Sequence, residues 1–161
     1  MKLKSVIEED VVNYRKTCMF IGTCFCDWKC CKEIGEDICL CQNSPAYNTK
    51  IKEIDNEKLV RRYLKNDMTH ALVLGGFEPL WENTWADTLE FLKCFRSKTS
   101  DDIVVYTGYR ESEVEDKIEQ LKSLGNVIVK FGRYRPGQNP HHDDVLGVDL
   151  ANDEQHAVKI A

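Results

Sequence analysis

Short apolar runs alternate along this chain with segments whose apolar residues recur every three or four positions. The runs at 19–26, 69–74, 103–106 and 127–131 predict buried strands, and the run at 156–160 predicts a last one. Three segments between them predict amphipathic helices. The first is capped by Asp55 and reaches about residue 65, the second is capped by Thr84, and the third begins at the capping-box pair Ser112 and Glu115 and ends at Gly125.

Strands that alternate with helices favour parallel strand pairing through right-handed crossovers. We therefore predict an α/β fold, a single-domain partial (open) βα barrel with mostly parallel strands over residues 1–161. A complete eight-unit barrel needs about 250 residues, so this barrel must be open on one side. Residues 132–147 contain prolines and glycines without a period, and they predict a long irregular segment.

The composition narrows the class of protein. Hydrophobic residues make up 42% of the 161 positions and charged residues 30%, which is typical of a folded globular protein. No apolar run approaches the roughly 20 residues that cross a bilayer. Residues 1–16 carry acidic residues where a secretion signal has an apolar core. We expect a cytoplasmic protein without membrane contacts, and the net charge of −5 disfavours nucleic-acid binding.

The cysteines carry the strongest chemical signal. Seven of the eight lie between residues 18 and 41, and Cys94 stands apart. In a reducing compartment such crowding favours metal binding over disulfides. Cys18 and Cys94 lie in apolar surroundings and are expected to be small buried residues.

The number of thiolate ligands would decide what a 4Fe-4S cluster can do. Three thiolates leave one iron free to bind a small molecule, whereas four close the site. The cysteines are also compatible with two other kinds of site. One is a structural zinc site built from Cys24 with Cys26 and Cys39 with Cys41, and the other is a closed electron-transfer cluster with Cys31 or Cys39 as fourth ligand. Residues 141–144, His-His-Asp-Asp, predict a solvated loop.

The segment from Cys26 to Cys30, Cys-Asp-Trp-Lys-Cys, resembles the first half of the radical S-adenosylmethionine (SAM) signature Cys-x3-Cys-x-aromatic-Cys. Glu33 occupies the place of the third cysteine. Leu40 and Asn43 around Cys41 look like the end of the signature, so the resemblance implies an inserted loop and a cluster bound by Cys26, Cys30 and Cys41. Cys31 and Cys39 compete for the third place. The cluster loop covers about residues 24–43.

Two further segments are similar to the same superfamily. Residues 75–79, Gly-Gly-Phe-Glu-Pro, look like its Gly-Gly-Glu-Pro element with one residue inserted. The resemblance implies that Gly75, Gly76 and Glu78 bind the amino group of SAM. Residues 106–109, Tyr-Thr-Gly-Tyr, resemble a strand end of the anaerobic ribonucleotide reductase activating protein and related glycyl-radical-enzyme activases, which implies that Tyr106 and Thr107 lie beside SAM.

The resemblance implies an enzyme, a radical SAM oxidoreductase of the activase type. Its reduced 4Fe-4S cluster would cleave SAM into methionine and a 5′-deoxyadenosyl radical, with no catalytic side chain beyond the cluster ligands. The implied protein partners are an electron donor of the flavodoxin or ferredoxin type and a glycyl radical enzyme, whose glycine segment would enter past residues 132–147.

Overall fold

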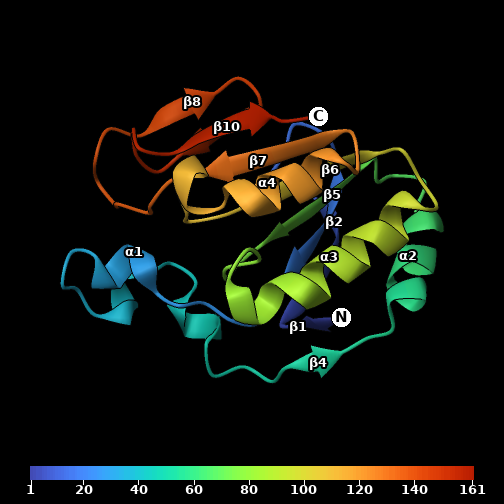
Figure 1. The fold of residues 1–161 in the computed structure, drawn as a ribbon, viewed down its shortest axis with the longest axis horizontal. Coiled ribbons are helices and arrows are strands. Elements are labelled where there is room, and N and C mark those ends of the chain that lie inside the picture. The colour runs from blue at the N-terminus through green and yellow to red at the C-terminus, as the bar shows by residue number, and fades with distance from the viewer.

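A six-stranded sheet forms the centre of the protein in a computed structural model that describes residues 1–161 (Figure 1). Its strands run in the order β10-β7-β6-β5-β3-β2. The four inner strands are parallel, and β2 and β10 pair antiparallel at the two edges. The strands are β2 (Ser5–Asp10), β3 (Cys18–Gly22), β5 (Ala71–Gly75), β6 (Asp102–Tyr106), β7 (Val127–Phe131) and β10 (His156–Lys159).

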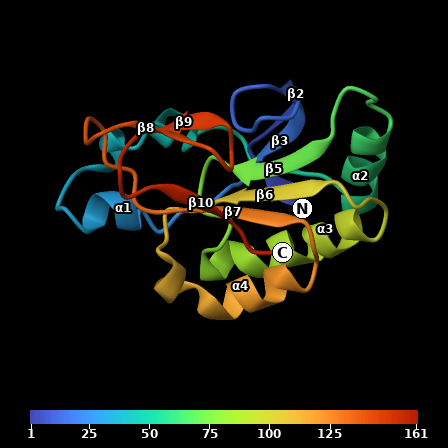
Figure 2. The same ribbon diagram turned by 90° about the horizontal axis from the view of Figure 1, so that it is seen from above.

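The larger helices cover one face of this sheet. They are α2 (Asn56–Leu64), α3 (Glu82–Arg96) and α4 (Glu115–Lys122). Side chains alternate across each strand, so Leu72 and Leu74 of β5 pack into the main core with these helices, while Ala71 and Val73 face a smaller core. Figure 2 shows α3 and α4 on one side of the sheet, and β8 (His141–Asp143) and β9 (Val148–Leu150) on the other.

The remaining elements are short. Strands β1 (Lys2–Leu3) and β4 (Lys52–Glu53) form a two-stranded ribbon, and β8 pairs with β9 in a hairpin. Helix α1 (Lys29–Lys32) lies in the cysteine-rich segment, where 3-10 turns cover Ile38–Leu40 and Ser44–Ala46, and another 3-10 turn covers Glu111–Glu113. No helix has the length and apolar character that crossing a membrane requires.

The expected fold class is confirmed as a mixed α/β fold with a mostly parallel central sheet. The sheet has two free edges, at β2 and β10, and no closed barrel is present. The predicted inner strands all form, with β3 ending at Gly22 and not near residue 26. The cap on α2 is also confirmed, because the Asp55 carboxylate accepts a hydrogen bond from the Lys58 amide at 2.9 Å.

Two predicted helix starts are wrong. Thr84 lies inside α3, since its amide already donates to the Trp81 carbonyl at 2.8 Å, and its hydroxyl is buried without a partner. Ser112 does not cap α4, because it lies in a 3-10 turn that is closed by the Arg110 amide donating to the Glu113 carboxylate at 2.8 Å.

The segment predicted to be irregular, 132–147, contains β8. The Asp143 carboxylate accepts hydrogen bonds from the amides of Val145, Leu146 and Ala157, which tie the turn after β8 to β10. In the same hairpin, the His142 ring lies 2.8 Å from the Asp149 carboxylate. The prediction of a loop at 141–144 is therefore wrong for residues 141–143, which form β8, whereas the predicted exposure is confirmed for His142, whose side chain is 57% exposed.

Candidate functional site

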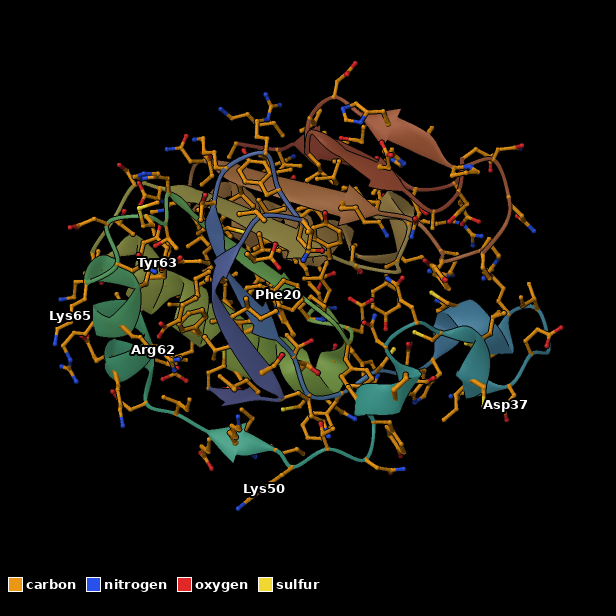
Figure 3. All side chains as sticks on the ribbon, turned by 180° about the vertical axis from the view of Figure 1, so that it is seen from behind. Phe20, Asp37, Lys50, Arg62, Tyr63 and Lys65 are labelled. Atoms are coloured by element: carbon orange, nitrogen blue, oxygen red, sulfur yellow. The ribbon has the colours of Figure 1, made fainter.

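The carboxyl ends of the parallel strands meet at one edge of the sheet, where α/β proteins bind their ligands. A cavity at this edge is lined by Cys26, Cys30 and Cys41 of the cysteine-rich segment, and by Gly76, Glu78, Tyr106 and Thr107 after β5 and at the end of β6. Figure 3 shows this segment, marked by Asp37, at the opposite end of the molecule from Arg62 of α2 and from Lys65, which follows that helix. Seven of the eight residues that the sequence predicted therefore surround one space.

Gly75 is the predicted residue that does not line the cavity. Its carbonyl accepts hydrogen bonds from the Thr23 amide at 2.9 Å and from the Thr23 hydroxyl at 3.0 Å, so it ties the ends of β5 and β3 together. Gly76 follows with a φ of +82°, and a Cβ there would lie 3.3 Å from the Gly22 Cα. This glycine lets the chain turn into the cavity at a position that disfavours other residues.

Glu78 is a buried carboxyl group at the centre of the site. Its oxygens accept hydrogen bonds from the Thr107 hydroxyl at 2.7 Å and from the amides of Gly108 at 2.8 Å and Leu80 at 3.1 Å. Burial nevertheless raises the pKa of Glu78 to about 7, because desolvation outweighs these bonds. The arrangement holds a carboxyl group in one orientation where a cationic ligand group could bind it.

Local contacts hold the first two cysteines beside the strand ends. The Trp28 amide donates to the Cys26 sulfur at 3.2 Å, and the Tyr109 hydroxyl donates to the Asp27 carboxylate at 2.6 Å. Trp28 itself has a φ of +59° and packs edge-on against Phe77 and Tyr47, each at 5.5 Å between ring centroids. Phe77, the residue inserted in the Gly-Gly-Glu-Pro-like element, thus supports the cysteine segment.

Glu33 occupies an ion-pair network and does not point to the thiols. Its carboxylate accepts hydrogen bonds from Arg110 at 2.8 Å, Arg133 at 3.2 Å and Arg135 at 2.5 Å. The hydrogen bond to Arg110 is the main cause that keeps the pKa of Glu33 below its usual value. Arg135 also donates to the Cys30 carbonyl at 2.5 Å, so the network attaches the cysteine segment to the residues after β7.

The other cysteines do not line the cavity. Cys31 is the buried residue of α1, and burial raises the pKa of its thiol. Cys39 is exposed, and its amide donates to the Asp37 carboxylate at 2.8 Å. Cys24 lines a separate cavity with Phe25 and Asp87, so the four cysteines of the alternative zinc site do not converge.

The cavity suits a cluster better than one metal ion. A single zinc ion needs all its thiolates at about 2.3 Å. No group of three or more His, Cys, Asp or Glu side chains converges in this way. Cluster ligands bind separate irons and can stand further apart. Space beside Cys30 depends on Gly108, because a Cβ there would lie 2.7 Å from the Cys30 sulfur.

Two of the residues in the wall of the cavity that the sequence analysis did not predict are a lysine and a glutamine. Lys130 of β7 and Gln155 before β10 both line it and are both buried. Burial lowers the pKa of Lys130 to about 8. The signal for Lys130 was a charged residue inside the apolar run 127–131. Gln155 carried no comparable signal.

A family comparison identifies the group that this cavity fits. The family model of the 4Fe-4S single cluster domain matches residues 15–147, which include all eight cysteines. The chain belongs to the 4Fe-4S single cluster domain family. No curated protein and no solved structure matches the chain. As a 4Fe-4S single cluster domain, the protein has one set of cysteines that borders a common cavity, at positions 26, 30 and 41.

Proposed function

We propose that the protein is a radical SAM enzyme, in which Cys26, Cys30 and Cys41 bind the 4Fe-4S cluster and SAM binds beside it. The observation that carries this proposal is the position of Glu78 and Gly76 in the cavity of the three thiols, although they lie more than 30 residues further along the chain. Three thiolates leave one iron open to SAM. When bound and reduced, the cluster supplies one electron that splits SAM into methionine and a 5′-deoxyadenosyl radical.

The residues of the cavity have separate roles in this proposal. The Glu78 carboxylate accepts hydrogen bonds from the SAM ammonium group, and its bonds from Thr107 and Gly108 hold it in place for that contact. Gly76 lets the backbone approach the ligand closely. Tyr106 borders the same space, and its hydroxyl donates to the Asn13 carbonyl at 2.6 Å, which fixes its ring.

The arrangement of the strands supports the partial-barrel fold that this chemistry implies. The inner strands β3, β5, β6 and β7 follow one another in space in the order of the chain, and α2, α3 and α4 share one core against one face of the sheet. Consecutive parallel strands with helices on a single face are the start of a βα barrel.

We further propose that the radical is passed to another protein. The sheet is open at both edges, and a radical needs a covered site. A glycyl radical enzyme of the anaerobic ribonucleotide reductase kind is the proposed substrate. Its glycine segment would enter past residues 132–147. An electron donor of the flavodoxin or ferredoxin type would reduce the cluster.

Anaerobic reconstitution with iron and sulfide tests the first proposal. We expect a brown protein whose reduced electron paramagnetic resonance (EPR) spectrum changes when SAM is added, and which then releases methionine and 5′-deoxyadenosine. Cys41→Ala should abolish both results, and Cys18→Ala, with its buried thiol, is the matched control. A cluster whose EPR spectrum does not change when SAM is added contradicts the proposal and favours an electron-transfer function.

The proposed substrate needs a second experiment. Reduced enzyme, SAM and a glycyl radical enzyme from the same source should yield a glycyl radical doublet in the EPR spectrum. SAM cleavage that depends on a small molecule, with no protein radical, would contradict the activase proposal and leave the SAM chemistry standing.

A further inference from the structure

Lys130 is a buried cation without an ion-pair partner. Lys130 is 6% exposed, and no carboxylate lies within ion-pair distance of its ammonium group. Its one hydrogen bond is long, 3.4 Å from Nζ to the Gly132 carbonyl, and the Tyr106 ring centroid lies 5.9 Å away. A buried charge that no carboxylate contacts directly is costly, so a lysine kept there points to an anionic ligand.

Lys130 stands between two adjoining cavities. The cavity of the cysteines shares Lys130, Tyr106 and Gln155 with a second cavity, which no cysteine lines. The second cavity is bounded by Val12 in the turn after β2 and by the β9 residues Val148 and Leu150. In Figure 2, β9 lies on the face of the sheet opposite α4.

Gln155 adds a second donor to the shared wall. It is 5% exposed, and its Oε1 accepts a hydrogen bond from the Ala151 amide at 3.1 Å. This bond fixes the side chain, and the Nε2 amide group donates no hydrogen bond within the protein. Lys130 and Gln155, which both keep N–H donors without a partner in the protein, thus border the same two cavities.

We propose that Lys130 and Gln155 form a binding site for a carboxylate group at the junction of the two cavities. One cation and one neutral donor match the single charge and two oxygens of a carboxylate. Two molecules could supply that group, SAM through its methionine part or a substrate held in the second cavity. The first source rests on the proposed function, and the second does not.

The first arm of the test uses acetate as the probe. Thermal unfolding of the reconstituted protein, with and without SAM, is followed at rising acetate and at equal ionic strength in chloride. A ligand that binds only the folded state raises the unfolding midpoint. We expect acetate to raise it in the wild type, in Lys130→Arg and in the exposed-charge control Lys159→Met, and not in Lys130→Met or Gln155→Glu.

Lys130→Met and Gln155→Glu, the two variants expected to lose the acetate effect, are chosen so that the protein still folds. Gln155→Glu keeps the acceptor for the Ala151 amide and replaces the free donor with an oxygen that repels a carboxylate. Lys130→Met keeps the length of the side chain and removes the buried charge. Without acetate, Lys130→Met should unfold at a higher midpoint than the wild type.

The second arm identifies the source by comparing SAM with decarboxylated SAM in calorimetric titrations. If the site binds SAM, Lys130→Met weakens SAM binding by about 10- to 150-fold and leaves decarboxylated SAM unaffected. SAM then also abolishes the acetate effect. If the site binds a substrate, SAM affinity is unchanged and acetate still stabilises the SAM-loaded protein.

The two proposals fail separately in this design. A protein that does not bind SAM but keeps the Lys130-dependent acetate effect contradicts the proposed function alone. The carboxylate site is overturned if neither the acetate effect nor the affinity for SAM depends on Lys130 and Gln155.

Discussion

The Thr107 hydroxyl donates a hydrogen bond of 2.7 Å to Oε1 of Glu78, and so joins the segment after β6 to the segment after β5. The neighbouring Gly108 amide donates to Oε2 at 2.8 Å. Each oxygen of the carboxyl group is therefore held by the same short segment. A group fixed in this way binds a ligand without first losing rotational freedom, which favours affinity.

Glu78→Gln is expected to leave cluster assembly intact and to weaken SAM binding. Loss of one charge-assisted hydrogen bond, worth about 1.5 to 3 kcal/mol, lowers affinity roughly 10- to 150-fold. Calorimetric titration of reconstituted protein measures the dissociation constant, and iron analysis checks the cluster. Glu82→Gln, an exposed side chain on α3, is the control. An equal dissociation constant in the wild type, Glu78→Gln and Glu82→Gln would mean that residues 75–79 form only a turn and do not bind SAM.

The stability of the cluster-free protein should depend on the ionisation of Glu78. Its pKa is about 7 in the folded state against an ordinary value of 4.5, because the carboxyl group is buried. The folded protein therefore holds a proton that the unfolded chain has released. The free energy of unfolding falls as pH rises from about 4.5 and levels above about 7, by on the order of 3 kcal/mol.

Urea unfolding at pH 5 and pH 8 measures this contribution when the wild type is compared with Glu78→Gln. Glutamine does not titrate, so the difference in unfolding free energy between the two proteins should change with pH in favour of the variant at pH 8. A difference that stays constant from pH 5 to pH 8 would mean that Glu78 keeps an ordinary pKa.

Iron content should separate the cysteines into two groups. Cys26→Ala, Cys30→Ala and Cys41→Ala remove thiolates that border the cavity, and each should abolish a SAM-competent cluster. Cys18→Ala and Cys94→Ala should keep it, because neither thiol borders that cavity. Iron and sulfide analysis after reconstitution provides the measurement. If Cys41→Ala keeps its full iron content and Cys31→Ala or Cys39→Ala loses iron, the third ligand is Cys31 or Cys39 and not Cys41.

The sequence predicted the inner strands and the edge where the site forms because both depend on local signals. Apolar runs mark β3, β5, β6 and β7, and the cysteines, the Gly-Gly pair and the Tyr-Thr pair follow or end such runs. Edge strand β2 was not predicted, because its sequence, Ser-Val-Ile-Glu-Glu-Asp, is half acidic and only one of its residues is buried. Its strand character comes from pairing with β3.

Contacts between distant residues account for the rest. Glu33 meets Arg133 and Arg135 across about 100 residues of chain, and no spacing rule connects them. Lys130 stands out in the sequence only as a charge in an apolar run, since its lack of an ion-pair partner becomes visible once the strands are assembled. Gln155 reaches the cavity because β10 turns back beside β7.

Gly108→Ala should impair cluster assembly without unfolding the protein. The backbone conformation at Gly108 is not one that favours glycine, so alanine is compatible with it. The new methyl would lie 2.7 Å from the Cys30 sulfur, which can move aside in the cluster-free protein but not when it binds iron. We expect an unchanged unfolding midpoint before reconstitution and a reduced iron content after it. Full iron content would show that Cys30 is free to move.

Glu33→Ala should loosen the cysteine segment, because it removes the carboxylate that three arginines share. Arg133 is completely buried and would keep its bond to Glu113 at 2.7 Å, while Arg135 would lose its ion pair. The Glu33 side chain is 33% exposed and partly screened by water, so we expect a loss of about 1 to 2 kcal/mol in unfolding free energy.

Hydrogen exchange shows whether that loss is local. In Glu33→Ala the amides of residues 29–43 should exchange faster than those of β5 and β6, and the iron content after reconstitution should fall. Glu36→Ala is the matched control, since this exposed side chain four residues beyond α1 makes no hydrogen bond or ion pair. If both variants behave alike, the arginine network does not hold the segment, and the position of Cys30 must depend on Trp28 and its aromatic contacts.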